Sequence, residues 1–367
     1  MYDNISLTSE DNIIFLSTQF EDLRPSIESH CLSHNIKRHV FFLSSGTTSI
    51  SPKGYLISKK AMFTNANAVN THLSLNSEDR WGLTLPPFHV GGISMFFRSA
   101  LLNQRLPANL LPWSPNELPT LIKEQGVSVI SLVPSQIYDL VRLKKTCPET
   151  LKYVLAGGDF LSEALEQQAL DLGWPIIRTF GMSELGSQLA TGTLEKKNKL
   201  QVLSIHQVKV DELDRILVKS PSLFSYVLNY IETWEMQSAE SLFDPEGYYP
   251  LPDRAKLSGA YLIPLGRDDG RIKISGRLLD FFHLKNLLEE FCLKRNILRK
   301  MELYVKSDLR SGHKLCLLIE ESVEYRHAEE FQLLIQPWRI QLIKKVPCIE
   351  RTLLGKLKTS AQREDPE

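Results

Sequence analysis

The chain has 367 residues, of which 43% are hydrophobic and 23% are charged, and its 43 basic side chains balance 43 acidic ones. This length allows two domains with cores of their own, as in an ordinary globular protein. A formal net charge of zero gives no basis for bulk electrostatic binding to nucleic acid or to an acidic membrane surface, so we expect neither partner.

The first half of the chain alternates short apolar segments with amphipathic ones. Strands are predicted at 39–44, 81–92, 127–134, 151–158 and 175–181, and helices at 55–74, 116–125, 135–145 and 161–172. This alternation predicts an α/β domain with a largely parallel sheet, whose loops gather at the carboxyl ends of the strands. Ligands of such sheets bind outside those ends.

The pattern changes after about residue 205. Shorter strands are predicted at 206–220, 248–251 and 261–276, followed by a helix at 284–298, strands at 301–306 and 315–320, a helix at 326–336 and a strand at 339–345. The last group predicts a small α+β domain. We place the boundary between 276 and 277, which gives a large domain over 1–276 and a small domain over 277–367.

The five cysteines stand far apart, at positions 31, 147, 292, 316 and 348. No pair has CxxC spacing, so neither a disulfide framework nor a zinc site is expected. The first residues, MYDNISLTSEDN, lack the basic and apolar regions of a secretory leader, and no apolar run reaches the ~18 residues that span a bilayer. We therefore expect a cytoplasmic protein without a membrane span.

The loop after the first predicted strand combines small hydroxylated residues with glycine. It reads SSGTTSISPKG over 44–54. Backbone amides and hydroxyls in such a loop approach a polyphosphate closely, and Lys53 adds a positive charge. The loop is not a Walker A motif, because no Gly-Lys-Ser/Thr follows at the required spacing. Taken alone, the segment is interpreted equally well as a surface turn.

A second candidate site follows the strand at 175–181, where the sequence reads TFGMSELGSQ (179–188). Beside a bound triphosphate, the Glu184 carboxylate would be a suitable ligand for a hard cation. The alternative is purely structural, with Ser183 capping a helix whose first turn contains Glu184.

Four weaker features lie at other strand ends and near the C-terminus. They are AGGD (156–159), LPPFHVGG (85–92) with His89, the pair Asp253 and Arg277, and RTLLGKLK (351–358) with Lys356. Each has a simple structural alternative, respectively a strand-to-helix turn, a structural histidine, a surface ion pair and a solvated basic tail. What favours a functional role over these structural alternatives is the order of the features along the chain.

Taken in order, these six features resemble the motifs of the adenylate-forming superfamily, which contains acyl-CoA synthetases, luciferases and peptide-synthetase adenylation domains. The resemblance covers residues 44–358. It implies a large α/β domain, truncated at its N-terminus, and a small mobile domain that carries a catalytic lysine, Lys356. It also implies an AMP-forming acid–thiol ligase that uses ATP and Mg²⁺, with coenzyme A as co-substrate.

The resemblance assigns roles on the nucleotide side of the site. The implied nucleotide-binding residues are Ser44, Ser45, Gly46, Thr47, Thr48, Lys53, Gly157, Gly158, Asp159, Phe180, Gly181, Met182, Ser183, Asp253 and Arg277. Phe180 would stack on adenine, and Glu184 would hold Mg²⁺. Asp253 and Arg277 would bind the ribose hydroxyls. The implied catalytic residues are Lys356, His89, Thr47 and Glu184.

Within the superfamily, the sequence most resembles the o-succinylbenzoate–CoA ligases of menaquinone biosynthesis, through PPFHVGGISMFFR (86–98) and Ser187-Gln188. This resemblance implies that His89, Arg98 and Gln188 line the acyl pocket. The Arg98 guanidinium would grip the second carboxylate of an aromatic diacid, since a buried carboxylate needs a paired charge. The alternative for Arg98 is a surface position at a helix end.

The sequence departs from the family pattern in several places. Ser49 and Ile50-Ser51 replace the usual glycine after Thr48, only 43 residues precede the loop, and FFHLKN (281–286) replaces a Gly-Gly turn that lines the thiol channel. Leu251-Pro252 replaces the usual Thr-Gly before Asp253, and Leu279 stands at the hinge position. Three alternatives therefore stay open. They are another acyl-CoA synthetase, an adenylating enzyme that loads a carrier protein or stops at the adenylate, and a non-catalytic nucleotide-binding protein. The sequence is also compatible with a homo-oligomer.

Overall fold

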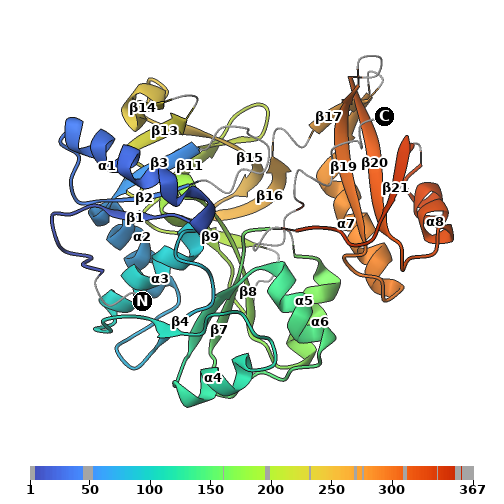
Figure 1. The fold of residues 1–367 in the computed structure, drawn as a ribbon, viewed down its shortest axis with the longest axis horizontal. Helices are drawn as coiled ribbons and strands as arrows, with labels where there is room; N and C mark the ends of the chain where they lie inside the picture. The colour runs from blue at the N-terminus through green and yellow to red at the C-terminus, as the bar shows by residue number, and fades with distance from the viewer. Residues whose placement is uncertain are drawn as a thin grey trace.

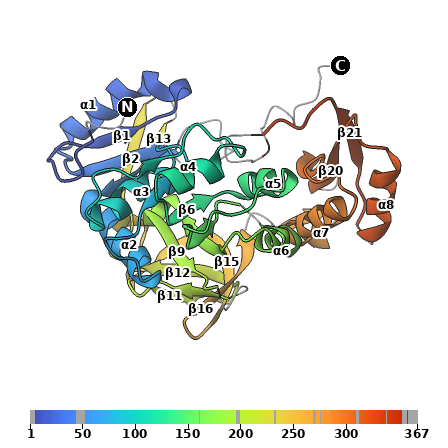
Figure 2. The same ribbon diagram turned by 90° about the horizontal axis from the view of Figure 1, so that it is seen from below.

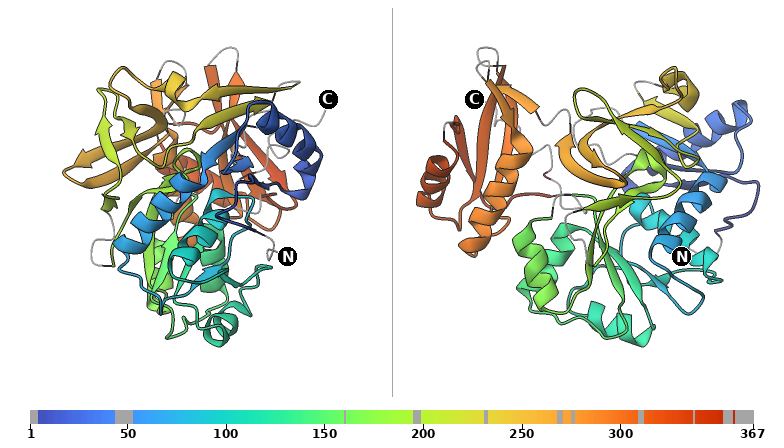
Figure 3. Two further views of the ribbon diagram at one scale, coloured as in Figure 1. Left: turned by 90° about the vertical axis from the view of Figure 1, so that its left-hand side faces the viewer. Right: turned by 180° about the vertical axis from the view of Figure 1, so that it is seen from behind.

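The protein folds into a large domain and a smaller domain that lies to one side of it (Figure 1). The right-hand view of Figure 3 shows from behind that the small domain projects from the large one. The computed structural model describes residues 5–43, 53–159, 161–194, 199–230, 233–267, 271–274, 277–308, 312–336, 338–351 and 357.

An eleven-stranded sheet forms the centre of the large domain. Its order is β11 (Gln207–Val210), β12 (Arg215–Lys219), β15 (Tyr249–Ser258), β16 (Tyr261–Arg267), β10 (Leu200–Val202), β9 (Ser187–Thr191), β8 (Ile176–Met182), β7 (Tyr153–Ala156), β6 (Val129–Leu132), β4 (Trp81–Leu83) and β5 (Ala108–Asn109). The strands from β8 to β5 are parallel, and those from β9 to β11 pair antiparallel. The predicted parallel sheet therefore makes up one half, because the short β8–β9 connection can join only antiparallel neighbours.

Helices cover both faces of the parallel half. One face carries α4 (Leu118–Glu124), α5 (Pro134–Arg142) and α6 (Glu163–Asp171), and the other carries α2 (Lys59–His72) and α3 (Val90–Leu101). Neighbouring strand residues alternate between the two cores, so that Val154 faces α4–α6 and Leu155 faces α2 and α3. An ion pair of 2.7 Å between Arg178 on β8 and Glu166 ties α6 to the sheet.

A second sheet packs on the far side of α2 and α3. It contains five strands in the order β1 (Ile13–Phe15), β2 (His39–Leu43), β3 (Lys53–Ser58), β13 (Tyr226–Tyr230) and β14 (Trp234–Ser238). Its outer face is covered by η1 (Thr18–Leu23) and α1 (Arg24–Ser33), over a small core that includes Ile27, Phe41 and Trp234. The rings of Phe41 and Trp234 meet edge to face at 5.9 Å, a favoured aromatic geometry.

Two predicted elements are wrong in detail. The helix expected at 55–74 begins at Lys59, because Tyr55-Leu56-Ile57 favour a strand and Ser58 caps the helix by accepting from the Ala61 amide. The strand expected at 81–92 ends at Leu83, and its two glycines lie in the first turn of α3. A Cβ atom on Gly92 would lie 2.1 Å from the Pro86 carbonyl oxygen, so glycine lets the helix approach that turn closely.

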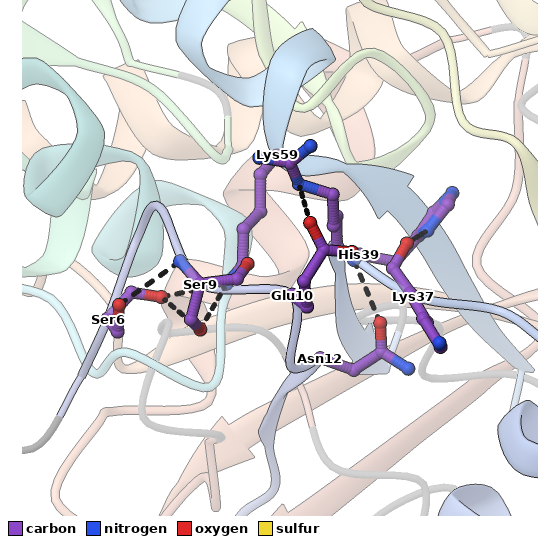
Figure 4. Close-up of polar contacts among 8 residues, drawn as sticks. Ser6, Ser9, Glu10, Asn12, Lys37, His39 and Lys59 are labelled. Carbon is purple, nitrogen blue, oxygen red and sulfur yellow. Dashed lines mark hydrogen bonds and ion pairs between the residues drawn. The ribbon is translucent and has the colours of Figure 1, made fainter.

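The segment before β1 is held by a buried lysine (Figure 4). The Lys59 ammonium donates to the carbonyl oxygens of Ser6 at 2.7 Å and Ser9 at 3.0 Å. Asn12 accepts from the His39 amide at 2.9 Å. These bonds fasten the segment to the start of α2 and of β2, and they satisfy a charge that is only 4% exposed.

The small domain has its own core, which includes Leu284, Phe291, Leu317 and Phe331. Its elements are β17 (Arg271–Ile274), β18 (Arg277–Asp280), α7 (Phe281–Lys294), β19 (Met301–Asp308), β20 (Gly312–Glu320), α8 (Arg326–Leu334) and β21 (Leu342–Val346). The expected boundary between 276 and 277 falls inside the β17–β18 hairpin. Since β17 packs beside β20, we propose that the small domain begins with β17.

The two domains meet where α6 and α7 lie side by side (Figure 2). Tyr138 on α5 also packs against the core of the small domain. No helix among the described residues is both long enough and apolar enough to cross a bilayer. One further short helix, η3 (Ala239–Leu242), follows β14.

Candidate functional site

The strongest sequence candidates meet at the corner where β8 turns into β9. η2 (Ser183–Leu185) joins the strands, and Gly186 follows it with a φ of 69°, which glycine adopts without strain. A Cβ atom on Gly181 would lie 2.1 Å from the carbonyl oxygen of Ser187. The corner therefore requires glycine at both positions, and this fixes the course of the chain between them.

Glu184 lies in this corner with its carboxylate half buried. Its Oε1 atom accepts a hydrogen bond of 2.7 Å from the Tyr55 hydroxyl, and its carbonyl oxygen accepts one of 2.9 Å from the Phe224 amide. Both main chain and side chain are thus held from β3 and from the segment before β13. The carboxylate is presented in one orientation.

The structural alternative for this motif is wrong. The residue before the short helix is Met182 rather than Ser183, and it makes no side-chain cap hydrogen bond. The helix has only 3 residues and is of the 3-10 type, so it offers Glu184 almost no helix dipole to stabilise. Phe180 and Met182 pack partly buried against the main core.

The surroundings of Glu184 fit a magnesium ion better than a metal that needs a protein cage. No group of three or more His, Cys, Asp or Glu side chains in the described part of the chain is arranged to hold a metal. Mg²⁺ in nucleotide sites uses one or two carboxylates, with phosphate oxygens and water completing its shell. The single held carboxylate of Glu184 would meet that requirement beside bound phosphates.

Aromatic side chains surround the Glu184 carboxylate. The rings of Tyr55 and Phe224 meet at 5.1 Å, and those of Phe224 and Tyr249 also meet at 5.1 Å. Burial, aided by the Glu184 charge, raises the pKa of Tyr249 to about 12. The Lys53 ammonium lies over the Tyr55 ring, 5.3 Å from its centre. Tyr55 therefore contacts a cation through its ring and an anion through its hydroxyl.

The AGGD turn follows β7, directly beside β8. Gly158 has a φ of 84°, and a Cβ atom on Gly157 would lie 2.5 Å from the Thr179 hydroxyl. That hydroxyl donates to the Ala156 carbonyl at 3.1 Å. Glycine at these positions lets the turn lie flat against the strand that carries Phe180. Asp159 is exposed at the end of the turn and faces the small domain, where its charge acts on Glu289.

His89 stands at the start of α3, as the residue before its first turn. Its ring contacts that of Phe88 at 4.7 Å. Arg98 lies in the last turn of the same helix. At about 1.5 Å per residue the two backbones are roughly 13 Å apart, although a long helical side chain leans back toward the N-terminus. An acyl pocket that uses both must run along α3.

Arg98 is buried, with 1% of its surface exposed, so the alternative of a surface position is wrong. Its Nη2 atom donates to the Ser187 hydroxyl at 2.8 Å, and its guanidinium lies 4.9 Å from the centre of the Trp81 ring. The Nε atom has no hydrogen-bond partner, and no carboxylate among the described residues pairs with the group. Burial lowers the pKa of Arg98 to about 9, which leaves the guanidinium charged at neutral pH.

Gln188 is buried on β9, where its side-chain oxygen accepts from the Thr191 hydroxyl. Its carbonyl oxygen accepts from Asn65 on α2 at 2.8 Å and contacts the His206 Nε2 atom at 3.0 Å. Burial lowers the pKa of His206 to about 4, so this imidazole is neutral at pH 7. The network fixes the start of β9, and with it the Ser187 hydroxyl that holds Arg98.

The two predicted ribose ligands lie on different domains. Asp253 is on β15, opposite Arg267 of β16. Arg277 begins β18 of the small domain, and its side chain lies outside the described part of the structure. Their joint role therefore stays a prediction. The neighbour Arg254 is 3% exposed and pairs with Asp214 at 2.8 Å, which gives it a structural role instead.

Several predicted site residues lie outside the described residues. These are the phosphate-loop residues Ser44, Ser45, Gly46, Thr47 and Thr48, and the C-terminal Lys356. The strands on either side of the loop, β2 and β3, are adjacent and antiparallel. β2 therefore ends, and β3 begins, next to the Tyr55–Glu184 contact.

Sequence analysis missed Tyr55, Ser187 and Trp81 as parts of the site. Tyr55 was assigned to a helix, and a helical position would have pointed its side chain elsewhere. Ser187 was seen only as a family-level feature, and the contact with Arg98 joins positions 89 residues apart. The sequence signal that could have identified Tyr55 is its position directly after Lys53-Gly54, at the end of the predicted phosphate loop.

The chain was compared with protein families and with solved structures. Residues 34–210 match the family described as AMP-binding enzyme. The predicted resemblance to the adenylate-forming superfamily is thereby confirmed. A 2-succinylbenzoate–CoA ligase from Bacillus cytotoxicus is 32% identical over 151 residues, which are 40% of this chain and 31% of that protein. The match thus spans about a third of the length of this relative.

Solved structures share the fold across most of the chain. An o-succinylbenzoate CoA synthetase (MenE) from Bacillus subtilis, in complex with the acyl-adenylate intermediate OSB-AMP, superposes with a TM-score of 0.73 at 20% identity. It covers 89% of this chain, which in turn covers 69% of it. The same enzyme with ATP and magnesium ion gives 0.72 at 20% identity, over 88% of this chain and 70% of that one. The predicted two-part α/β fold is confirmed.

Proposed function

We propose that the chain activates a carboxylic acid with ATP, forming an acyl-adenylate, and then transfers the acyl group to coenzyme A. A carboxylate oxygen attacks the α-phosphorus of ATP, and pyrophosphate leaves. The thiol sulfur of coenzyme A then attacks the acyl carbonyl carbon and loses its proton, while AMP leaves with the bonding electrons. The proposal extends to this chain what its relatives' names state of them.

The observation that carries the proposal is the β8–β9 corner. Within a few residues it holds Glu184, a carboxylate fixed for a cation, and Ser187, which bonds a buried guanidinium. One side of the corner suits Mg²⁺-bound phosphates, and the other suits an anionic acyl group. This is the arrangement needed to bring a carboxylate up to a triphosphate.

Other residues would bind the metal ion, the phosphates and the adenine, and would stabilise the charge that develops in the reaction. When bound, Mg²⁺ would neutralise phosphate charge, and Glu184 would hold it. Lys53 lies where it can attract the polyphosphate, and Phe180, Gly157 and Gly158 shape a flat surface suited to adenine. Lys356 is proposed as the cation that stabilises charge growing on the α-phosphate.

We further propose o-succinylbenzoate as the acid, which would place the chain in menaquinone biosynthesis. One carboxylate of this diacid must react, and the other would be buried in the acyl pocket. Arg98 is a buried cation whose charge no described carboxylate balances, and a guanidinium binds a carboxylate through two parallel hydrogen bonds. His89 at the other end of α3 would line the same pocket, and Gln188 would support its wall.

The test is a pyrophosphate-release assay over a panel of acids, with and without coenzyme A. We expect turnover with o-succinylbenzoate, and little with benzoate, 4-phenylbutyrate or medium-chain fatty acids. Lys356→Ala should lose roughly 10²–10³-fold in adenylation and much less in thioester formation. No pyrophosphate release with any acid would favour the non-catalytic alternative, and a variant that adenylates at the wild-type rate would remove Lys356 from the site.

One observation favours a second function. β18 ends at Asp280 and α7 begins at Phe281, so FFHLKN (281–286) forms the first turns of a helix. Where relatives are expected to have a Gly-Gly turn beside the thiol, this chain has bulky helical side chains. An enzyme that stops at the adenylate, or that loads a carrier protein, would fit this feature. Pyrophosphate release that does not depend on coenzyme A, with no acyl-CoA formed, would support it.

A further inference from the structure

Tyr55 makes a contact that the proposed chemistry has not used. Its hydroxyl donates a hydrogen bond of 2.7 Å to Oε1 of Glu184, across 129 positions of sequence. The side chain is 1% exposed. A buried hydroxyl bonded to a carboxylate is a charge-assisted hydrogen bond, stronger than one between neutral groups.

Neither partner of this bond is free to reorient. Tyr55 lies on β3 between β2 and β13, where it pairs with Phe42 and Val227. Its ring packs edge-on against Phe224 at 5.1 Å, and the Phe224 amide also holds the Glu184 carbonyl oxygen. Phe224 therefore contacts both Tyr55, the donor, and Glu184, the acceptor.

Tyr55 also contacts two opposite charges. The Lys53 ammonium lies 5.3 Å from the ring centre, whereas Glu184 binds the hydroxyl at the far end of the side chain. No ion pair between Lys53 and Glu184 occurs in the described part of the structure. Lys53 and Glu184 therefore both contact Tyr55 without forming an ion pair with each other.

We propose that Tyr55 is a positioning residue that holds Oε1 of Glu184 and leaves Oε2 directed toward the metal ion of the bound nucleotide. This rests on the proposed function, in which Glu184 is the carboxylate ligand. Groups that hydrogen-bond to a metal ligand fix its orientation, and removing one typically costs 10–100-fold in metal affinity. Tyr55 itself touches neither substrate nor metal.

The test measures divalent-ion binding by the full chain in the presence of ATP and without acid, using Mn²⁺ and its paramagnetic resonance signal. We expect Tyr55→Phe, which removes only the hydroxyl, to weaken Mn²⁺ binding roughly 10–100-fold. ATP affinity without metal should not change. Tyr249→Phe is the matched control, because Tyr249 packs on the same Phe224 ring and has no hydrogen bond to Glu184.

A double-mutant cycle with Glu184→Gln separates positioning from stability. If Tyr55 acts through Glu184, adding Tyr55→Phe to Glu184→Gln should weaken Mn²⁺ binding little further. Wild-type Mn²⁺ affinity in Tyr55→Phe, or losses that simply add in the double variant, would overturn the proposal. A wild-type protein that binds ATP but shows no ATP-dependent Mn²⁺ binding would overturn the metal role of Glu184 first, and the role of Tyr55 with it.

Discussion

Two buried charges, one in each domain, differ in what surrounds them. In the small domain, the Glu302 carboxylate lies 2.9 Å from the Lys285 ammonium and 2.8 Å from the Arg351 guanidinium. In the large domain, Arg98 is 1% exposed, and the described residues offer it one hydroxyl and one aromatic ring. Within the described residues, the Glu302 charge is compensated by opposite charges and the Arg98 charge is not.

The difference separates a structural charge from a binding charge. Burial opposes the ionisation of Glu302, but the charges of Lys285 and Arg351 hold its pKa below the usual value. For Arg98, burial acts alone and lowers the pKa to about 9. A buried charge without a partner reduces stability, and such costs concentrate at functional sites. We infer that the missing anion of Arg98 comes from a ligand.

The largest effect is expected at the compensated charge. Glu302→Gln leaves the Arg351 guanidinium without its anion, whereas the Lys285 ammonium is 41% exposed and can turn to water, so the small domain should lose about 2–3 kcal/mol of its free energy of unfolding. Urea titration followed by hydrogen exchange in β19 and β20 measures this loss. Glu321→Gln, at an exposed residue in the turn after β20, is the control and should change stability by less than about 0.5 kcal/mol. An equal change in the free energy of unfolding of the two variants would contradict the structural role of Glu302.

A smaller effect is expected at the one hydroxyl that binds Arg98. Ser187→Ala leaves Nη2 buried without its hydrogen bond, which should cost about 1–2 kcal/mol of stability in the ligand-free protein. Ser99→Ala is the matched control, because the Ser99 hydroxyl on the same helix is buried and has no partner. The control should be neutral or slightly stabilising. A loss in Ser99→Ala as large as in Ser187→Ala would show that the bond to Arg98 contributes nothing.

The smallest effect concerns a third buried charge, at the junction of the domains. Burial and the neighbouring Asp159 raise the pKa of Glu289 from 4.5 to about 7, against the opposing charge of Arg299. Because the folded-state pKa is raised, the contribution of Glu289 to the free energy of unfolding is fully present below pH 4.5. That contribution is lost as the pH rises through 7. Glu289→Gln should therefore raise the thermal midpoint by a few degrees above pH 8 and leave it unchanged near pH 4. Glu290→Gln, its exposed neighbour, should change it at neither pH.

Much of the fold follows from local pattern. The alternation in 127–181 correctly predicts β6, α5, β7, α6 and β8, because continuous apolar strands and amphipathic helices differ clearly in period. The small domain is predicted nearly element for element for the same reason. The failures lie where local pattern competes with tertiary pairing. The β3 segment is predicted as part of α2, and the elements not predicted at all are α1, α3 and the strands β1, β5, β9, β10, β13 and β14.

The residues of the candidate site are predicted from sequence motifs more than from hydrophobic periodicity. Glu184 and Arg98 were found because each stands in a recognisable segment, but what decides their roles is a partner distant in sequence. The Tyr55 hydroxyl and the Ser187 hydroxyl reach them across 129 and 89 positions, and no local signal encodes such contacts. That no carboxylate of the described part of the chain lies beside Arg98 is likewise visible only in three dimensions.

The most direct measurement is the acid specificity of Arg98→Met, read as the kcat/KM ratio of pyrophosphate release for o-succinylbenzoate over 4-phenylbutyrate. Methionine fills a similar volume, so removing an uncompensated charge should leave the thermal midpoint of the ligand-free protein unchanged or higher. The ratio should fall roughly 10²-fold, because the second carboxylate of the diacid loses its partner. A variant that unfolds more readily and keeps the diacid preference would contradict the account.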